Sequence, residues 1–502
     1  MNIRNRTLLA AAGAFSMLAG CAVGPNFKAP GAPVTAGYVP GALSSPIASA
    51  NGPGSEAQRF IDGLDIPGQW WTLFRSSDLN ALIERALANN PTLEAAQAAL
   101  RQANENLAAG RGSYAPTVSG SVQSARERAS SASFGNIPGL PSAFLYSLNS
   151  ASVNVSYTLD AFGGVRRQVE ALQAQAEYEQ FVLEASYLSL TANVVTAAVT
   201  EASLRAQIAA TEEIGAAQQR QLEIVQRRFD AGGSSRSDVL QQQATLQNTL
   251  ASLPLLRSQL AQERNLLAAY IGVLPADYAE SEFRLDTLHL PEELPVSLPS
   301  KLVEQRPDVR EYGALLHEAS AEIGVATSNL LPQITLSGSY GGEAARFADV
   351  FSPGSVVWSL VGGLTQPIFK GGTLIHQRRA AVAAAQQAAA NYQATVITAF
   401  QNVSNTLAAL QADAEIFAAQ SAGEQAARDS LLLVQAQFKS GAASYTQVLT
   451  AEQTFQNAAV SLVKARAQRY ADTAALFQAL GGGWWNRADV KANSTDCCKG
   501  HL

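Results

Sequence analysis

Phe229-Asp230-Ala231-Gly232 recurs 209 residues later as Phe438-Lys439-Ser440-Gly441, and this repetition decides the fold. At the same offset, Val239-Leu240 matches Val448-Leu449. Similar segments at a fixed offset are the signature of an internal repeat. We therefore expect two units of roughly 200 residues that share one structural plan.

Each repeat is predicted to contain an amphipathic helix, a pair of strands, a long helix and a return helix. The first repeat spans residues 78–276, with strands near 114–126 and 150–160, a long helix near 165–230 and a return helix near 236–270. The second repeat spans residues 300–485, with strands near 333–341 and 356–366, a long helix near 373–440 and a return helix near 444–480. A proline-rich connector, residues 277–299, joins the two repeats.

The two long helical stretches are rich in Ala, Gln, Glu, Leu and Arg, which are strong helix formers. Each contains no proline and one glycine, Gly215 in the first and Gly423 in the second. A helix of more than 60 residues reaches about 100 Å, because each residue adds 1.5 Å. Gly232 and Gly441 follow these helices, where a glycine just beyond the last turn is expected.

The N-terminus carries a secretion and lipidation signal. Residues 1–20 combine Arg4 and Arg6 with an apolar run over residues 7–19, which is too short to span a bilayer. Leu18-Ala19-Gly20-Cys21 then predicts cleavage before Cys21 and covalent lipid on that cysteine. The alternative is a plain secretory signal with a chance cysteine. Residues 21–77 are expected to be a lipidated, extended segment, and Ala22 in place of Asp favours the outer membrane.

The four predicted strands alternate apolar and polar side chains. In residues 151–159, for example, Ala151, Val153 and Val155 alternate with Ser152 and Asn154. A length of about 8–12 residues with one apolar and one polar face suits a transmembrane β-strand, which has ~9–11 residues. Each segment alone also suits a half-buried strand of a soluble sheet. Four such segments in a repeated, lipid-anchored chain favour the membrane.

Four strands are too few to close a membrane barrel. Backbone groups in hydrocarbon must all be paired, and single-chain bacterial barrels begin at about eight strands. Two copies of the chain would give eight strands and three would give twelve. Because an eight-stranded barrel is filled by its own side chains, a duct favours three or more copies.

Composition and charge exclude several functions. A net charge of -6 without a basic patch argues against a nucleic-acid partner. The four histidines are scattered, and no phosphate-binding loop, catalytic triad or metal motif is present, so we predict no enzyme activity and no cofactor beyond the lipid on Cys21. Residues 486–502 are expected to be a disordered tail. Its Cys497-Cys498 pair would either bind metal or crosslink, or be an exposed, unstructured pair.

Three blocks of sequence carry a family resemblance: residues 21–30, Trp70-Trp71-Thr72-Leu73-Phe74, and Arg306-Pro307-Asp308-Val309-Arg310. On these residues, the chain resembles the TolC-type outer-membrane factors. Within that family it is similar to the NodT-like lipoprotein branch of RND efflux systems. The resemblance covers about residues 21–485. The resemblance implies an α+β membrane protein that forms a homotrimer. In the trimer, three chains contribute four strands each to one 12-stranded transmembrane β-barrel. A periplasmic α-helical barrel continues this β-barrel. The resemblance also implies docking to a periplasmic adaptor (membrane fusion protein) and an inner-membrane RND transporter, and passive conduction of drugs or other toxic small molecules.

In this family the helical tips gate the duct and meet the adaptor. Many relatives carry Asp-Val-Leu-Asp in the second tip, but this chain has Gln447-Val448-Leu449-Thr450, so we expect a more neutral constriction held by Tyr445, Val448 or Leu449. The alternative is that these apolar residues only pack the hairpin. The candidate gate and adaptor-docking residues are Arg228, Asp230, Gly232, Asp238, Phe438, Gly441, Tyr445, Gln447, Leu449 and Thr450.

Two other functions remain open from the sequence. The same architecture serves as the outer-membrane duct of type I protein secretion, although that branch usually lacks the lipid anchor. A trimeric lipoprotein stalk or adhesin without a lumen would instead have continuous heptads and no paired strands.

Overall fold

The computed structural model describes residues 22–33, 35, 37–39, 41, 56–130, 141–279 and 282–490. The predicted signal peptide, Cys21 and the Cys497-Cys498 pair lie outside the described residues. The chain forms two compact units. One comprises residues 1–29, 101–178 and 312–392, and the other residues 30–100, 179–311 and 393–502.

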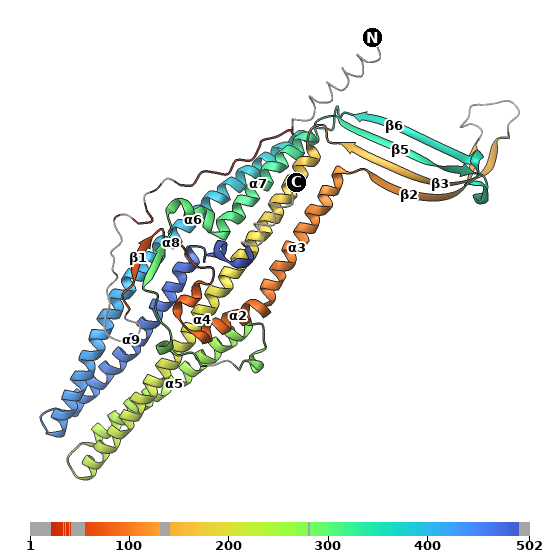
Figure 1. The fold of residues 1–502 in the computed structure, drawn as a ribbon. Coiled ribbons are helices and arrows are strands. Elements are labelled where there is room, and N and C mark those ends of the chain that lie inside the picture. Colours follow the sequence, from red (N-terminus) through yellow and green to blue (C-terminus); the bar gives the residue numbers. More distant parts are fainter. Residues whose placement is uncertain are drawn as a thin grey trace. The chain divides into compact units, whose positions relative to one another are not determined.

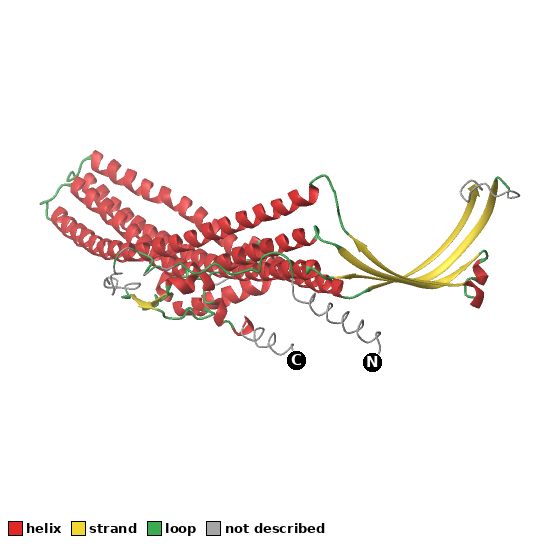
Figure 2. Cartoon of the chain, turned by 90° about the horizontal axis from the view of Figure 1, so that it is seen from above, coloured by secondary structure: helices red, strands yellow, loops and turns green. Residues whose placement is uncertain are grey.

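The first unit contains one antiparallel sheet of four strands in the order β2-β3-β5-β6, curved as Figure 2 shows. Its strands are β2 (Thr117–Ser130), β3 (Ala143–Leu159), β5 (Gln333–Ala344) and β6 (Val356–Thr365). Large apolar side chains project from the sheet: Val118, Trp358 and Leu360 are 67%, 74% and 80% exposed. Side chains of this kind on a strand surface suit contact with lipid.

The hairpin of β2 and β3 is longer than the sequence predicted. Pairing continues from Ala125↔Leu148 out to Ser130↔Ala143. The predicted bounds stopped short because Arg126-Glu127-Arg128 interrupts the alternation of apolar and polar residues. Polar pairing replaces apolar packing there, and the Tyr146 hydroxyl donates to Glu127 Oε2 at 2.6 Å.

The long helices reproduce the sequence repeat. Helices α4 (Gly164–Asp230) and α8 (Thr373–Lys439) each have 67 residues, and α5 (Arg236–Tyr270) and α9 (Tyr445–Ala479) each have 35. Every bound in the second set lies 209 residues after its counterpart in the first. Figure 1 shows both hairpins turning through short loops. The sequence repeat therefore corresponds to a repeated structure, in which each half of the chain forms one hairpin of a long helix and a shorter helix.

The short helices also match between the repeats. Helix α2 (Ser77–Asn89) precedes α3 (Pro91–Arg111), and α6 (Pro299–Gln305) precedes α7 (Pro307–Ser328). Pro91 therefore lies at a helix junction, as the first residue of α3, a position that tolerates proline because its missing N–H would be unpaired anyway.

The segment predicted to be extended, residues 21–77, has more structure than expected. Its strand β1 (Arg59–Asp62) pairs in parallel with β4 (Glu293–Val296), which lies in the predicted connector. A short 3₁₀ helix, Trp70–Phe74, buries Trp70, Trp71 and Phe74 in the core of the second unit. Trp70 stacks on Phe477 with ring centroids 5.2 Å apart, so this segment is part of the core.

The prediction of a disordered tail from residue 486 is wrong for residues 486–490. Arg487 Nη1 lies 2.7 Å from Glu184 Oε2, and the guanidinium lies 3.9 Å from the centre of the Tyr187 ring. Burial raises the pKa of Glu184, which the Arg487 charge opposes. The buried Glu184 carboxyl group needs a cation, and Arg487 supplies it from 303 residues further along the chain. The polar sequence around Arg487 gives no indication of this contact.

Among the described residues, α4 alone is long and apolar enough to cross a membrane by length and composition. The apolar window of α4 is 56% buried within the structure, and a buried core helix meets the same criteria.

Candidate functional site

The two helical tips have the same backbone design. Gly232 and Gly441 adopt φ values of +74° and +82°, a left-handed conformation that favours glycine. Gly233 N donates to Arg228 O at 2.7 Å, and Ala442 N donates to Gln437 O at 2.8 Å. These are Schellman ends, which satisfy carbonyl groups that the last helical turn leaves unpaired.

Asp238 and Gln447 both cap the helix that follows the turn. Asp238 Oδ2 accepts from Ser235 N at 2.9 Å, and Gln447 Oε1 accepts from Ser444 N at 2.7 Å. Each serine hydroxyl in turn accepts from the backbone N–H three residues on, which completes a capping box. Gln447 therefore performs the same structural task as Asp238. The pattern Ser-x-x-Asp/Gln is the sequence signal for this role.

Apolar side chains from both hairpins form a tip cluster of four buried residues, Val225, Phe438, Tyr445 and Val448. Phe438 and Tyr445 lie with ring centroids 5.3 Å apart. Leu449 is half-buried and packs against the cluster. In the single chain, Tyr445 and Val448 thus pack between the hairpins, and their part in a constriction stays a prediction.

Arg228 joins the end of α4 to the end of α8. Its guanidinium lies 4.4 Å from the centre of the Phe438 ring, and it donates to Phe438 O at 3.3 Å and to Lys439 O at 3.2 Å. A positive charge at the carbonyl end of a helix interacts favourably with the helix dipole.

A network of polar side chains, the tip network, lies behind the tip cluster. Gln242 of α5 is fully buried, accepts from the Tyr445 hydroxyl, and donates to Gln218 O at 3.0 Å. It also hydrogen-bonds the Glu452 carboxyl group, as does Gln435. Burial raises the pKa of Glu452 to about 7 and raises that of Tyr445. The network connects α4, α5, α8 and α9.

Sequence reasoning did not find the tip network, because Gln and Glu in a helix normally indicate a solvated face. The other predicted tip residues lie on the surface. Asp230 accepts from Gln226 Nε2 at 2.9 Å on its own helix, and the Thr450 hydroxyl donates to Thr446 O at 3.0 Å. The structure therefore gathers Arg228, Phe438 and Tyr445 at one place and leaves Asp230 and Thr450 exposed.

The model of the outer membrane efflux protein family matches residues 82–273 and 298–482. This chain belongs to that family. The antibiotic efflux pump outer membrane protein ArpC of Pseudomonas putida is 30% identical over 485 residues, covering 96% of this chain and 96% of that protein. The toluene efflux pump outer membrane protein TtgC, also of Pseudomonas putida, is 29% identical with the same coverage. The solved outer-membrane channel OprN is 25% identical, with a TM-score of 0.83 over 92% of this chain and 100% of that one.

The predicted family, the efflux function and the outer-membrane location are therefore confirmed. The alternative of a stalk without paired strands is wrong, because the described residues of this efflux protein include a four-stranded sheet. The assignment of the tip residues to a gate stays a prediction.

In this efflux protein, Arg167 near the start of α4 binds the segment that directly follows the predicted lipidation site. Arg167 is 3% exposed, its Nε donates to Val23 O at 3.1 Å, and its Nη2 donates to Asn26 Oδ1 at 2.7 Å. Glu170 balances the guanidinium charge at 2.6 Å. The residues after Cys21 are thereby fixed beside the junction of β3 and α4.

Gly324 of α7 makes room for this contact. A Cβ there would lie 2.6 Å from Arg167 Cγ and 2.9 Å from Val23 O. We expect Gly324→Val to release residues 22–29 and to make limited proteolysis within them about tenfold faster, because cleavage follows the population of the released segment. Gly313→Ala on the same helix is the control, since its nearest neighbour would be Tyr392 Cε2 at 3.7 Å. Equal cleavage rates in both variants would contradict the assignment.

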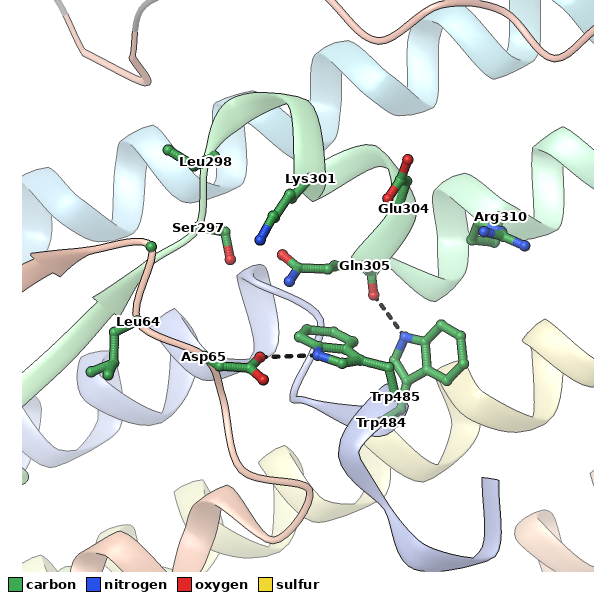
Figure 3. Close-up of a pocket in the computed structure, with 11 residues that line it drawn as sticks. Leu64, Asp65, Ser297, Leu298, Lys301, Glu304, Gln305, Arg310, Trp484 and Trp485 are labelled. Atoms are coloured by element: carbon green, nitrogen blue, oxygen red, sulfur yellow. Dashed lines mark hydrogen bonds between the residues drawn. The ribbon is translucent and has the colours of Figure 1, made fainter. Parts of the chain in front are cut away.

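A polar pocket of about 490 Å³ lies where the C-terminal tryptophans meet the N-terminal segment (Figure 3). Trp485 Nε1 donates to Asp65 Oδ1 at 3.0 Å, and Trp484 Nε1 donates to Gln305 O at 2.7 Å. Both indole N–H groups are thus satisfied within the protein. The pocket joins three distant segments of the chain.

Proposed function

We propose that this efflux protein works as a homotrimer whose three sheets close into one 12-stranded transmembrane barrel. The supporting observation is the sheet itself, whose edge strands β2 and β6 each pair on one side only within the described residues. Unpaired backbone groups are not tolerated in hydrocarbon, so both edges must pair with other copies. Three copies leave a lumen, whereas eight strands would be filled by side chains.

The long helices would continue the duct through the periplasm. A helix of 67 residues is about 100 Å long at 1.5 Å per residue. The tips, with Arg228, Asp238, Phe438, Tyr445, Gln447 and Leu449, would dock a periplasmic adaptor and form the gate. The adaptor and an inner-membrane RND transporter would deliver the cargo and supply the energy, and the duct would carry out no catalysis.

The cargo class proposed for this chain is small toxic organic molecules. The names of the relatives support it, since ArpC belongs to an antibiotic efflux pump and TtgC to a toluene efflux pump. Covalent lipid on Cys21 would anchor the mature N-terminus to the outer membrane. Mass spectrometry of the mature N-terminal peptide tests the lipid directly.

The purified protein in detergent is expected to have the mass of three chains by light scattering. In a strain that lacks the gene, a plasmid copy should restore resistance to antibiotics or solvents at least severalfold over the empty vector. A dimeric mass would contradict the 12-stranded barrel. If the strain that lacks the gene keeps its normal resistance but no longer secretes a large protein, the result would favour type I secretion instead.

A further inference from the structure

A pocket of about 290 Å³ lies between α4, α8 and α9, above the tips. Its volume is just below the roughly 300–1,000 Å³ typical of small-molecule sites. Its apolar lining comes from all three helices. These side chains are Ile214, Leu431, Phe455, Leu462 and Val463.

Two buried polar side chains also line this pocket. Glu452 is 5% exposed and Gln218 is 1% exposed. Within the described residues, Glu452 Oε2 and both polar atoms of the Gln218 amide have no hydrogen-bond partner. The great majority of buried polar atoms in proteins are paired, because a buried polar atom without a partner destabilises the folded state. Three such atoms at one pocket therefore indicate a partner from outside the chain.

The charges around the pocket indicate that this partner carries a positive charge. Glu452 forms no ion pair within the described residues, whereas Glu424 on the pocket wall is paired with Arg428 at 2.6 Å. Arg428 also lies 5.0 Å from the centre of the Phe455 ring. The other charged residues of the lining are Glu213 and Arg220 of α4. Glu452 is thus the buried acid without a cation, and the lining beside it is apolar.

We propose that this pocket binds a small amphipathic cation, with an ammonium group at Glu452 and Gln218 and an apolar body along Phe455, Leu462 and Val463. The ammonium group would donate to Glu452 Oε2 and to the Gln218 amide oxygen, which pairs two of the three atoms. The aromatic or aliphatic body would cover the apolar side chains. The site lies in the wall formed by the helices, and its existence does not depend on which cargo the duct carries or on how the tips open.

Burial raises the pKa of Glu452 to about 7, and the hydrogen bonds from Gln242 and Gln435 partly oppose this. A cation is held by the carboxylate and not by the carboxylic acid. Affinity is therefore expected to rise as the pH increases through 7. The pocket lining also includes four other charged residues, Glu213 and Arg220 of α4 and Glu424 and Arg428 of α8. These four residues are unchanged in all the variants compared below.

The probe is 4-phenylbutylamine, with the uncharged 4-phenyl-1-butanol as its matched partner, titrated calorimetrically into the full-length protein in detergent. The amine is expected to bind at pH 8.5 at least tenfold more tightly than the alcohol, and at least tenfold more tightly than at pH 5.5. Glu452→Gln should lose most of the preference for the amine. Asp429→Asn, an exposed acid on α8 outside the pocket, should keep it.

Ala459→Phe provides a second, independent variant, because it fills the pocket without touching the charge of Glu452. It is expected to abolish binding of both probes while the thermal melt and oligomer mass stay unchanged. Equal binding of amine and alcohol would overturn the cation assignment. Absence of binding to the wild-type protein, or wild-type affinity in the Ala459→Phe variant, would overturn the site and leave water as the partner of these polar atoms.

Discussion

Gln242→Ala is expected to raise the open probability of the duct in planar bilayers about tenfold or more. Gln242 connects α4, α5 and α9, because it donates to Gln218 O and accepts from the Tyr445 hydroxyl. Its removal leaves the buried Tyr445 hydroxyl without its partner, at a cost of about 1–3 kcal/mol, and leaves Glu452 with the hydrogen bond from Gln435 alone. A state with separated tips exposes both groups to water. The cost therefore falls on the arrangement with packed tips, and each 1.4 kcal/mol changes the ratio of states tenfold.

The matched control for this prediction is Gln241→Ala. Gln241 is the neighbouring residue on α5, its side chain is exposed, and its Nε2 donates to Ser237 Oγ on the same helix at 3.4 Å. This variant should conduct like the wild type. If both variants form intact oligomers and conduct equally, the tip network does not hold the tips together and the constriction lies elsewhere.

Periodicity was sufficient to predict most of the fold. The 3.6-residue and two-residue patterns are properties of consecutive residues, so the long helices and the four strands are visible in the sequence. The pair of β1 and β4 is not, because four residues are too few to establish a pattern and their partners lie 234 residues apart. Arg487 shows the same limit, since its assignment to a disordered tail ignored a buried acid far away in the chain.

The candidate site was predicted in part, for a related reason. The glycine turns and the apolar tip residues follow from local sequence, and the capping boxes at Ser235 and Ser444 were also readable there. Gln218 and Gln242 were not recognised, because a glutamine on a helix looks the same in sequence whether it faces water or another helix. Only the packing of two hairpins against each other makes them buried.

The second large effect concerns stability and pH. Asp413 of α8 is 7% exposed and shares a side-chain hydrogen bond with Asp472 of α9. Burial, and then the hydrogen bond and charge of Asp472, raise the pKa of Asp413, while Arg469 opposes the shift. The folded protein therefore retains a proton that the unfolded chain has released at neutral pH. Its free energy of unfolding falls as the pH rises from about 4, the ordinary range for Asp, to the raised value.

Asp413→Asn removes this penalty, because an amide keeps a donor at the same position and does not ionise. Each unit of pKa shift corresponds to about 1.4 kcal/mol, so the variant should melt several degrees above the wild type at pH 8, and the gain should shrink towards pH 4. Melting curves across this range in detergent measure it, with the exposed Glu415→Gln as the control. A gain in Tm that is the same at pH 5 and pH 8 would show that Asp413 is ionised in the folded protein throughout. Arg469 would then hold the two carboxylates together in place of a shared proton.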